Sequence, residues 1–259
     1  MLLSKPYAVA SAASLISPVM SLSLPQYKGL KTSLNSSILQ VTFHNPSSPV
    51  NLWNQDTQDD LTDLVSRLQK DEETKVVIFN SDVTIGAVEG RARGAGNELL
   101  VALDMRFATK TDTVFGQQEV GLGLFPGGGG SQFLPGLIGR GLAMEYILSS
   151  KDISATDAEK IGWINKAFDT SADLYEYIEN LATRLSLFPL AALHGGKKSI
   201  NHASAPSRED IIADAKAYFT QVLDPLTQEI AKNTAELIAN ISVLGFELNV
   251  GETIPLIYA

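Results

Sequence analysis

Hydrophobic residues recur with two different spacings along this 259-residue chain, and each spacing predicts one kind of element. Short apolar runs bounded by turn-forming residues predict buried strands, and they occur at Leu30–Thr32, Ile38–Phe43, Lys75–Phe79, Ile85–Val88 and Trp163–Ala167. Apolar positions three or four residues apart predict helices, and they occur over Thr57–Gln69, Asn97–Leu103, Gly136–Ser149, Ser154–Ile161, Asp173–Ser186, Pro189–Asn201, Ser207–Val222 and Leu226–Val243. The pattern predicts an α/β chain whose last part is helical.

Capping and helix-breaking residues mark several helix ends. Ser154 or Thr156 is the candidate N-cap of one helix, because either hydroxyl can accept from the first free N–H groups. Ser207 and Asp210 have the S-x-x-[DE] spacing of a capping box, in which Asp is the weaker partner. Pro225 interrupts the last helical stretch, since proline lacks the N–H that a helix interior needs. These positions predict separate helices in the C-terminal part.

The stretch Thr84–Pro135 is rich in glycine and contains the candidate chemistry. Glycines between the strand at Ile85–Val88 and the helix at Asn97–Leu103 allow tight turns and a close approach to a ligand. Ala95 lies at or near the predicted start of this helix, where free N–H groups favour negative charge. Such a helix end suits a developing oxyanion as well as it suits a phosphate.

Two glutamates in this stretch have small or apolar neighbours. Glu98 falls one turn into the predicted helix, and Glu119 precedes a run of glycine and apolar residues. Two carboxyls held together in an apolar site have their pKa values pushed apart, so one can act as acid and the other as base. Each feature also has a simpler interpretation, because an early helical glutamate interacts well with the dipole and Gly127–Gly130 can be a flexible turn. No Gly-Lys-Ser/Thr follows these glycines, which argues against a nucleotide-triphosphatase loop.

Composition narrows the classes of function. A hydrophobic content of 44% is enough for one large domain, or for one domain with an appended arm. The net charge of −9 argues against nucleic acid as a partner. The chain has no cysteine for disulfides, thiolate catalysis or zinc binding, and His44, His194 and His202 lack metal-ligand spacing, so no metal site is predicted. No stretch is long and apolar enough to predict a membrane span.

Ordered motifs extend through the same glycine-rich stretch. The pattern G-x-A-x-G-x-G-x-E-L begins at Gly90, a D-x-R-x-A segment begins at Asp104, and F-G-Q-x-E-x-G-L-G-x-x-P-G-x-G-G-x-Q begins at Phe115. This order of motifs resembles the enoyl-CoA hydratase/isomerase, or crotonase, family. The resemblance is clear from Thr84 to Phe168 and fainter on either side.

The resemblance implies a crotonase-like spiral of strand–strand–helix repeats, with C-terminal helices that pack against neighbouring subunits in a homotrimer or a hexamer. It implies an acyl-CoA thioester as substrate, in which coenzyme A is part of the substrate and no metal or redox cofactor is needed. Lys197 and Lys198 are the basic candidates for binding a CoA phosphate, although a solvated helix face explains both lysines equally well. Gly195–Gly196 precede them and predict a soft break in that helix.

The resemblance also implies roles for single residues. Glu98 and Glu119 fall on the glutamates that hold and activate the added water in hydratases of this family. Ala95 falls on the residue, usually glycine, whose backbone N–H donates to the thioester oxygen. Gly127 falls on a residue whose N–H helps to position the water. The presence of both glutamates favours a hydratase, while Gln118 replaces the usual proline before Glu119.

The link between two predicted strands departs from the family pattern. In the family, the strands that correspond to Lys75–Phe79 and Ile85–Val88 are parallel neighbours, separated by dozens of residues that supply the other oxyanion N–H and much of the adenine pocket. Here only Asn80–Thr84 lies between them. A parallel crossover needs about a dozen residues or more, whereas these five reach at most roughly 17 Å. We therefore expect the crossover to be absent and the sheet to be rearranged or gapped.

We expect the chain to divide into a disordered extension at residues 1–20, a crotonase-like core at residues 21–205 and a C-terminal helical oligomerisation region at residues 206–259. The extension carries one charge, Lys5, and no Arg, unlike a typical transit peptide. The last residues, Leu-Ile-Tyr-Ala, differ from the Ser-Lys-Leu peroxisomal address. We expect an intracellular protein, and the sequence leaves cytoplasm, mitochondrion and peroxisome open.

Three hypotheses on function follow. The first is an enoyl-CoA hydratase-like enzyme that adds water to a 2-enoyl-CoA thioester. The second is an isomerase, or another acyl-CoA reaction on the same scaffold. The third is a catalytically impaired crotonase-like subunit that acts by association, because losing one oxyanion donor typically lowers kcat about 10²–10³-fold. The short link equally suits a shortened form of the protein, a specialised enzyme with a more open site or a site completed by a partner subunit. The sequence does not determine the acyl chain of the substrate or the pathway.

Overall fold

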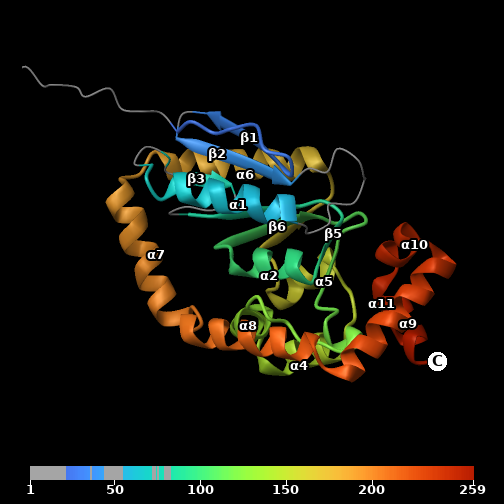
Figure 1. Cartoon of the computed structure of the whole chain (residues 1–259). Coiled ribbons are helices and arrows are strands. Elements are labelled where there is room, and N and C mark those ends of the chain that lie inside the picture. Colours follow the sequence, from blue (N-terminus) through green and yellow to red (C-terminus); the bar gives the residue numbers. More distant parts are fainter. Residues whose placement is uncertain (1–21, 36, 44–54, 72–73, 75, 79–82) are drawn as a thin grey trace, which may run out of the picture.

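The computed structural model describes residues 22–35, 37–43, 55–71, 74, 76–78 and 83–259, and it is mixed α/β (Figure 1). Its first described sheet joins β1 (Leu30–Asn35), β2 (Ile38–Phe43) and β3 (Val76–Ile78). The second joins β4 (Ile85–Val88), β6 (Met105–Thr109) and β9 (Lys166–Phe168), all parallel. The third joins β5 (Arg91–Arg93), β7 (Val114–Gly116) and β8 (Ile153–Ser154). The expected α/β class is confirmed.

Helices surround these sheets and make up the described chain after β9. Those in the first two-thirds are α1 (Gln55–Leu68), α2 (Ala95–Ala102), η1 (Val120–Leu122), α3 (Gly130–Ile138), α4 (Arg140–Ser149) and α5 (Ala155–Ile161). The later ones are α6 (Ser171–Ser186), α7 (Leu190–Ser204), α8 (Arg208–Val222), α9 (Pro225–Ile241), α10 (Val243–Leu248), α11 (Val250–Thr253) and η2 (Ile254–Tyr258). In Figure 1, α7 descends along one side and α8 runs beneath α2. Across the described residues, every helix is too short or too polar to cross a membrane.

The largest hydrophobic cluster lies around the glycine-rich stretch. Trp163, Phe115 and Leu134 are fully buried there, and they pack with residues of α2 and α4. A second cluster joins β4 and β6 to α6 through Ile85, Phe107 and other side chains. A third cluster is confined to η1, η2 and the C-terminal helices α9–α11. Because burial of apolar area is the main stabilising term in folding, the first cluster holds the segment that contains the motifs.

Several predicted helix starts are confirmed with their caps. Ser154 Oγ accepts from the Asp157 N–H at 3.2 Å and precedes α5, so Ser154 rather than Thr156 is the cap. Ser207 Oγ accepts from the Asp210 N–H at 3.2 Å and precedes α8. Pro225 is the first residue of α9, a position where its missing N–H costs no helical hydrogen bond. Local side-chain chemistry therefore determines these ends.

Three boundaries predicted from the sequence are wrong. The single helix expected at Gly136–Ser149 is two helices, α3 and α4, because Gly139 has a φ of +81° that cannot continue a right-handed helix. The strand expected at Trp163–Ala167 begins only at Lys166, since the Trp163 N–H instead closes the end of α5 by donating to Ala158 O at 2.9 Å. Gly195–Gly196 lie inside an uninterrupted α7, where glycine lowers helix stability without breaking the hydrogen bonds.

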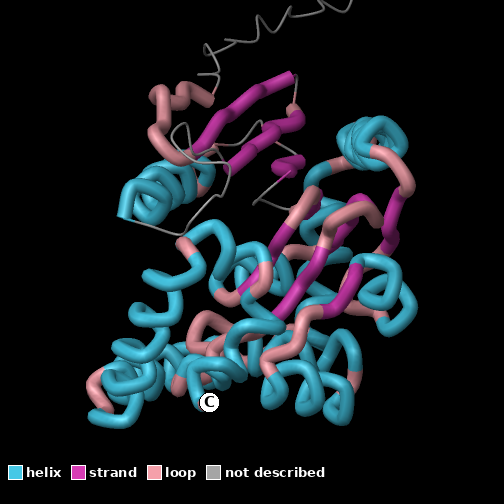
Figure 2. Tube along the Cα trace, turned by 90° about the vertical axis from the view of Figure 1, so that its right-hand side faces the viewer, coloured by secondary structure: helices cyan, strands magenta, loops and turns pink. Residues whose placement is uncertain are grey.

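The sheet is divided at the short link. Among the described residues, β3 pairs in parallel with β2, whereas β4 pairs in parallel with β6. Figure 2 shows the first sheet standing apart from the other strands. The division fits the expectation of a gapped sheet. The linking residues 79–82 and the expected extension at residues 1–20 lie outside the described residues, so the prediction of an absent crossover stays a prediction.

Candidate active site

The N-terminus of α2 forms one wall of the candidate site. Gly94 precedes the helix with a φ of +50°, a conformation that favours glycine, and its N–H donates to Gly116 O of β7 at 3.1 Å. The Glu98 N–H donates to Gly94 O at 2.9 Å and closes the first turn. Ala95 is therefore the first helical residue, and its N–H has no acceptor within the helix. This is the position expected for a donor to a thioester oxygen.

The glycine run Gly127–Gly130 binds a carboxylate and is not a flexible turn; it is called the glycine cradle below. Glu98 is only 8% exposed, and its Oε1 accepts from the N–H groups of Gly128 at 2.7 Å and of Gly130 at 3.0 Å. A Cβ on Gly128 would lie 2.7 Å from Glu98 Oε2, so only glycine allows this approach. Burial raises the pKa of Glu98, the two N–H donors lower it and the negative charge of Asp214 raises it. The balance leaves the Glu98 pKa above its ordinary value.

Glu119 lies against the same helix end, and the only backbone hydrogen bond that acts on its pKa within the described residues comes from its own residue and lowers it. It precedes η1, and a Cβ on Gly94 would lie 3.2 Å from Glu119 Oε1. Its Oε2 is buried and accepts no hydrogen bond from the part of the chain that the structure describes. Burial raises the pKa of Glu119 to about 7, and the negative charge of Glu98 contributes to the increase. The two carboxyls thus interact and differ in their hydrogen-bond donors.

A tyrosine from α8 covers the glycine cradle, and sequence reasoning did not assign it a role. A Cβ on Gly127 would lie 2.5 Å from Tyr218 Cβ, so the two residues are in direct contact. The Tyr218 ring also packs edge-on against Phe125, with 6.4 Å between ring centroids. Burial raises the pKa of the Tyr218 phenol, and the charges of Glu119 and Glu98 raise it further. The sequence signal for this residue is its place on the apolar stripe of a predicted helix.

A network of buried polar side chains holds α2 in place. Asn97 Oδ1 accepts from Trp163 Nε1 at 2.9 Å, and the Asn97 amide lies 2.8 Å from the Gln117 amide. All three side chains are fully buried. Buried polar groups that find partners rigidify their surroundings. These hydrogen bonds between buried side chains therefore fix the position of Glu98, the next residue along the helix.

Gln118 is held by a second polar network that sequence reasoning missed. Its Nε2 donates to Asp152 Oδ1 at 2.7 Å, in place of the proline expected there. Asp152 also forms an ion pair with Arg93 of β5, whose Nε donates to Oδ1 at 2.7 Å. Arg93 reaches the backbone oxygen of Glu247 in α10. The residue before Glu119 is thus connected to the C-terminal helices.

Lys197, proposed as a phosphate ligand, forms an ion pair in this structure. Its Nζ lies 2.8 Å from Asp104 Oδ2, which also accepts from the Thr84 N–H at 2.7 Å. Lys198 is exposed on α7. The roles of both lysines stay predictions. No group of three or more His, Asp or Glu residues within the described ranges is arranged to hold a metal ion.

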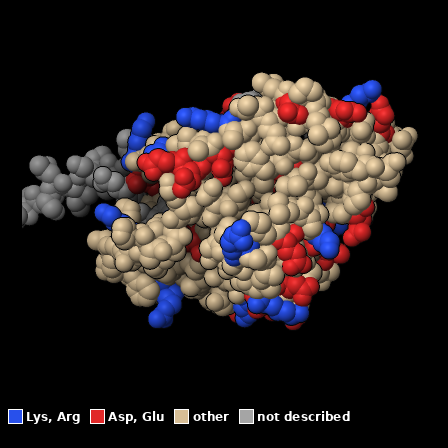
Figure 3. Space-filling model, turned by 90° about the horizontal axis from the view of Figure 1, so that it is seen from below, with Lys and Arg blue, Asp and Glu red and all other residues tan. Residues whose placement is uncertain are grey.

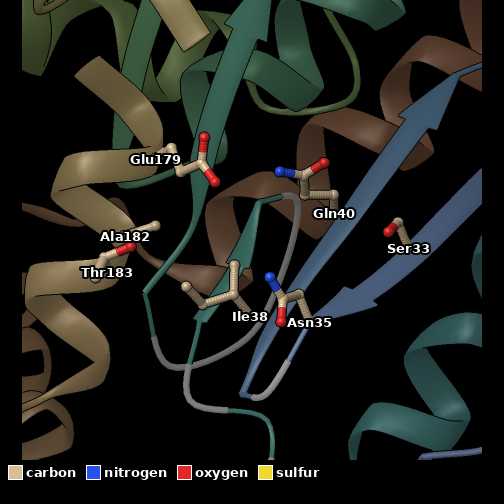
Figure 4. Close-up of a pocket in the computed structure, with 7 residues that line it drawn as sticks. All are labelled: Ser33, Asn35, Ile38, Gln40, Glu179, Ala182 and Thr183. Carbon is tan, nitrogen blue, oxygen red and sulfur yellow. The ribbon is translucent and has the colours of Figure 1, made fainter. Parts of the chain in front are cut away.

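A separate cavity of about 210 Å³ lies between the β1–β2 hairpin and α6 (Figure 4). It is lined by Ser33, Asn35, Ile38, Gln40, Glu179, Ala182 and Thr183. Gln40 and Glu179 stand on opposite sides of it (Figure 4). None of the candidate catalytic residues contributes to its lining.

The fold and the paired carboxyls define an α/β protein with an acidic site at a helix N-terminus. The sequence profile of the family described as enoyl-CoA hydratase/isomerase matches residues 80–231. The crystal structure of a candidate enoyl-CoA hydratase from Streptomyces avermitilis is 32% identical, with a TM-score of 0.81 over 90% of this chain and 99% of that one. The chain belongs to the enoyl-CoA hydratase/isomerase, or crotonase, family.

Curated relatives match a shorter part of the chain. A short-chain-enoyl-CoA hydratase of Clostridium acetobutylicum is 38% identical over 117 residues, which are 45% of this chain and 44% of that protein. A 2,3-dehydroadipyl-CoA hydratase of Escherichia coli is 32% identical over 142 residues, or 55% of this chain and 54% of that protein. The chain therefore spans about half the length of the curated relatives it matches.

Proposed function

We propose that this chain adds water to a 2-enoyl-CoA thioester. The observation that carries the proposal is the meeting of two unequal carboxyls at the start of α2. Glu98 is held by two backbone N–H groups, and Glu119 presents a buried oxygen that accepts no hydrogen bond from a described residue. The family supports the same reaction class, because its sequence profile matches residues 80–231, which contain both glutamates.

The surroundings of the two carboxyls suit different roles. The two N–H donors favour the ionised form of Glu98, which makes it the base that takes a proton from water as the oxygen bonds to C3. Glu119 has a pKa of about 7 and is the acid that gives a proton to C2. The Ala95 N–H stabilises the enolate oxygen between these steps. Proton exchange with solvent after product release returns Glu98 and Glu119 to their starting forms.

Gly127 and the two lysines complete the proposal as contacts to the water and to coenzyme A. Gly127 is buried next to the cradle, and its N–H is the proposed second contact to the water. Lys198 is exposed on α7 and can reach a CoA phosphate without breaking an ion pair, whereas Lys197 would have to leave Asp104. Coenzyme A is part of the substrate in this mechanism, and none of its steps uses a metal or redox cofactor.

Hydration of a short 2-enoyl-CoA tests the proposal. The loss of conjugated-thioester absorbance would be followed for the purified chain and for Glu98→Gln and Glu119→Gln. We expect each substitution to lower kcat by about 10²–10⁴-fold, since each removes one partner in proton transfer. Glu145→Gln, on the exposed surface of α4, is the matched control and should keep the wild-type rate. A folded chain that neither turns over nor binds enoyl-CoA would contradict the proposal.

The divided sheet supports a second candidate, a crotonase-like subunit that acts by association. Among the described residues, β3 and β4 do not pair, and in the family the segment between these strands supplies the other oxyanion N–H. Isomerisation on the same carboxyls is the neighbouring chemistry. Product analysis separates the three outcomes, because hydration gives a 3-hydroxyacyl thioester, isomerisation moves the double bond and a non-catalytic subunit leaves the substrate unchanged.

We also propose that the chain assembles as a homotrimer or a hexamer. Large apolar side chains remain exposed along α8, α9 and the turn between them, and they include Phe219 at 69%, Leu223 at 78% and Leu226 at 63%. Viewed from below, uncharged surface extends between separate clusters of charged side chains (Figure 3). Contiguous exposed apolar surface is typical of protein–protein contacts.

A further inference from the structure

One face of α8 lies across the glycine cradle. Ile211 lies 3.9 Å from the position of a Cβ on Gly129, and Tyr218 contacts Gly127 as described above. Between them, Asp214 Oδ2 accepts from Gln132 Nε2 of α3 at 2.7 Å. Positions 211, 214 and 218 share one face of a helix, since they are spaced by three and four residues. The hydrogen bond to α3 and two apolar contacts therefore hold this face in place.

Tyr218 is the residue on this face that reaches both carboxyls. Its backbone-proximal atoms touch Gly127, and its phenol interacts with the charges of Glu119 and Glu98. Gly127 directly precedes Gly128, whose N–H, like that of Gly130, donates to Glu98. We propose that Tyr218 is a positioning residue: its ring closes the carboxyl pair off from bulk water and holds the turn that orients Glu98. The catalytic part of this inference rests on the proposed function.

Shielding by the ring has a consequence that can be measured without substrate. Burial is the largest cause of the raised pKa of Glu119; its own backbone hydrogen bond lowers that pKa and the charge of Glu98 raises it. Asp214 of α8 raises the pKa of Glu98, and the two glutamates raise the pKa of Tyr218. All of these groups are acidic. Removing the ring admits water, which stabilises the charged form of a buried carboxyl and lowers its pKa. Losing the phenolic oxygen alone leaves the ring in place and most of the shielding with it.

Carbon-13 NMR titration of the glutamate carboxyls in the ligand-free chain tests the inference. Glu119→Gln identifies the resonance that titrates near pH 7 by removing it. We expect Tyr218→Ala to lower that midpoint by about one pH unit or more, and Tyr218→Phe to lower it by less than about half a unit. Tyr175→Ala, at an exposed tyrosine of α6 that donates to Glu89, is the matched control and should leave the midpoint unchanged.

An unchanged midpoint in a folded Tyr218→Ala variant would overturn the inference. If that variant fails to fold, Tyr218→Leu keeps apolar bulk against Gly127 and should give an intermediate lowering, and an unchanged midpoint there would overturn it equally. The titration is independent of turnover. A lowered midpoint in Tyr218→Ala, with no hydratase activity in the wild type, supports the inference and contradicts the proposed function. Hydratase activity in the wild type, with an unchanged midpoint in Tyr218→Ala, supports the proposed function and contradicts the inference.

Activity provides the second readout where the chain turns over. Tyr218→Ala should move the pH at which kcat/KM changes in the same direction as the carboxyl midpoint, because kcat/KM reports the ionisation of the free enzyme. A structural role alone would lower the amount of folded protein without moving that pH. Tyr218→Phe should restore most of the wild-type profile, since it restores the ring.

Discussion

At the scale of single residues, the candidate site places one residue type in two opposite surroundings. Both carboxyls lie near the start of α2, but Glu98 accepts from two backbone N–H groups of the glycine run, whereas the one backbone hydrogen bond that acts on the Glu119 carboxyl comes from its own residue and its Oε2 accepts none from a described residue. Each donor offsets part of the cost of burying a charge. The contrast between cradled Glu98 and Glu119, whose Oε2 lacks a donor, separates base from acid in the proposed mechanism.

The cradle predicts a strong effect of a very small substitution. Gly128→Ala would place a methyl group 2.7 Å from the position of Glu98 Oε2, which forces the carboxylate or the turn to move. A displacement of about 1 Å at a catalytic group can lower kcat about 10²-fold. Rates of enoyl-CoA hydration, measured beside circular dichroism of the same samples, check this expectation.

The control for this substitution is another exposed glycine. Gly141 lies in α4, and a Cβ there would meet no atom within 4 Å. Gly141→Ala should keep the hydration rate and stabilise the chain by about 0.5–1 kcal/mol, because alanine restricts the unfolded chain and favours the helix. Equal rates for Gly128→Ala and Gly141→Ala would show that the cradle does not orient Glu98.

The raised pKa of Glu119 predicts a pH-dependent gain in stability when this residue is neutralised. The folded-state pKa is raised from 4.5 to about 7, so the contribution of Glu119 to stability is fully present below about pH 4.5 and is lost as the pH rises through about 7. Glutamine carries no ionisable proton. Glu119→Gln should therefore increase Tm relative to the wild type more at about pH 8 than at about pH 5. Thermal unfolding at both pH values measures this, and an identical Tm difference at the two would refute it.

Sequence located the two glutamates but not the residues around them. Glu98 and Glu119 stand at fixed spacings from motif glycines, so pattern alone found them. Tyr218 lies far along the chain on a helical stripe, and such a stripe has the same spacing whether it covers core or site. Asp152 has no local motif, because its contacts with Gln118 and Arg93 exist only after distant segments pack.

At the scale of elements, prediction succeeded where local chemistry determines the outcome. The helices after Ser154 and Ser207 begin at their capping side chains, and α6 follows its apolar spacing. The short strands β5 and β7 were not predicted, because each has three residues and is defined by pairing with the other across α2 and β6. Three residues are too few to establish a period. Their pairing is nevertheless what brings Gly94 and Gly116 together.

α7 is the element with the weakest attachment to the described body. None of its residues is buried, and Lys197 joins it to Asp104 through an ion pair whose side chains are 25% and 23% exposed. Partly exposed ion pairs contribute about 0.2–1 kcal/mol and weaken in salt. Lys197→Met should therefore lower hydrogen-exchange protection of the α7 amides by a comparable amount at low salt, and by less at high salt.

Lys198→Met provides the comparison for this prediction. Lys198 is the next residue on α7 and is exposed, so its replacement removes the same charge and a similar aliphatic chain at a position that forms no ion pair with a described residue. Exchange of the α7 amides should stay at the wild-type rate in this variant. Equal changes for both lysines, or a change that does not respond to salt, would rule out the ion pair as the attachment of α7.

At the scale of the whole molecule, α8 connects the site with an uncovered surface. Tyr218 contacts Gly127 of the site, whereas Phe219 on the same helix and Leu223 just after its end are 69% and 78% exposed. A helix whose inner face closes a site and whose outer face is apolar can transmit assembly to the site. The first sheet, which ends at β3, lies on the opposite side of the described body from α8 (Figure 1).

The exposed apolar side chains predict an assembly that one charge can break. If α8 and α9 form subunit contacts, the wild type should elute with three or six times the mass of the chain in size-exclusion chromatography with light scattering. Leu223→Glu would bury an unpaired carboxylate in that contact, which costs several kcal/mol and should shift the population toward monomer. Ser199→Glu adds the same charge to exposed α7 and should leave the mass unchanged. A monomeric wild type would contradict the assembly itself, whereas an oligomer insensitive to Leu223→Glu would place the contact on another surface.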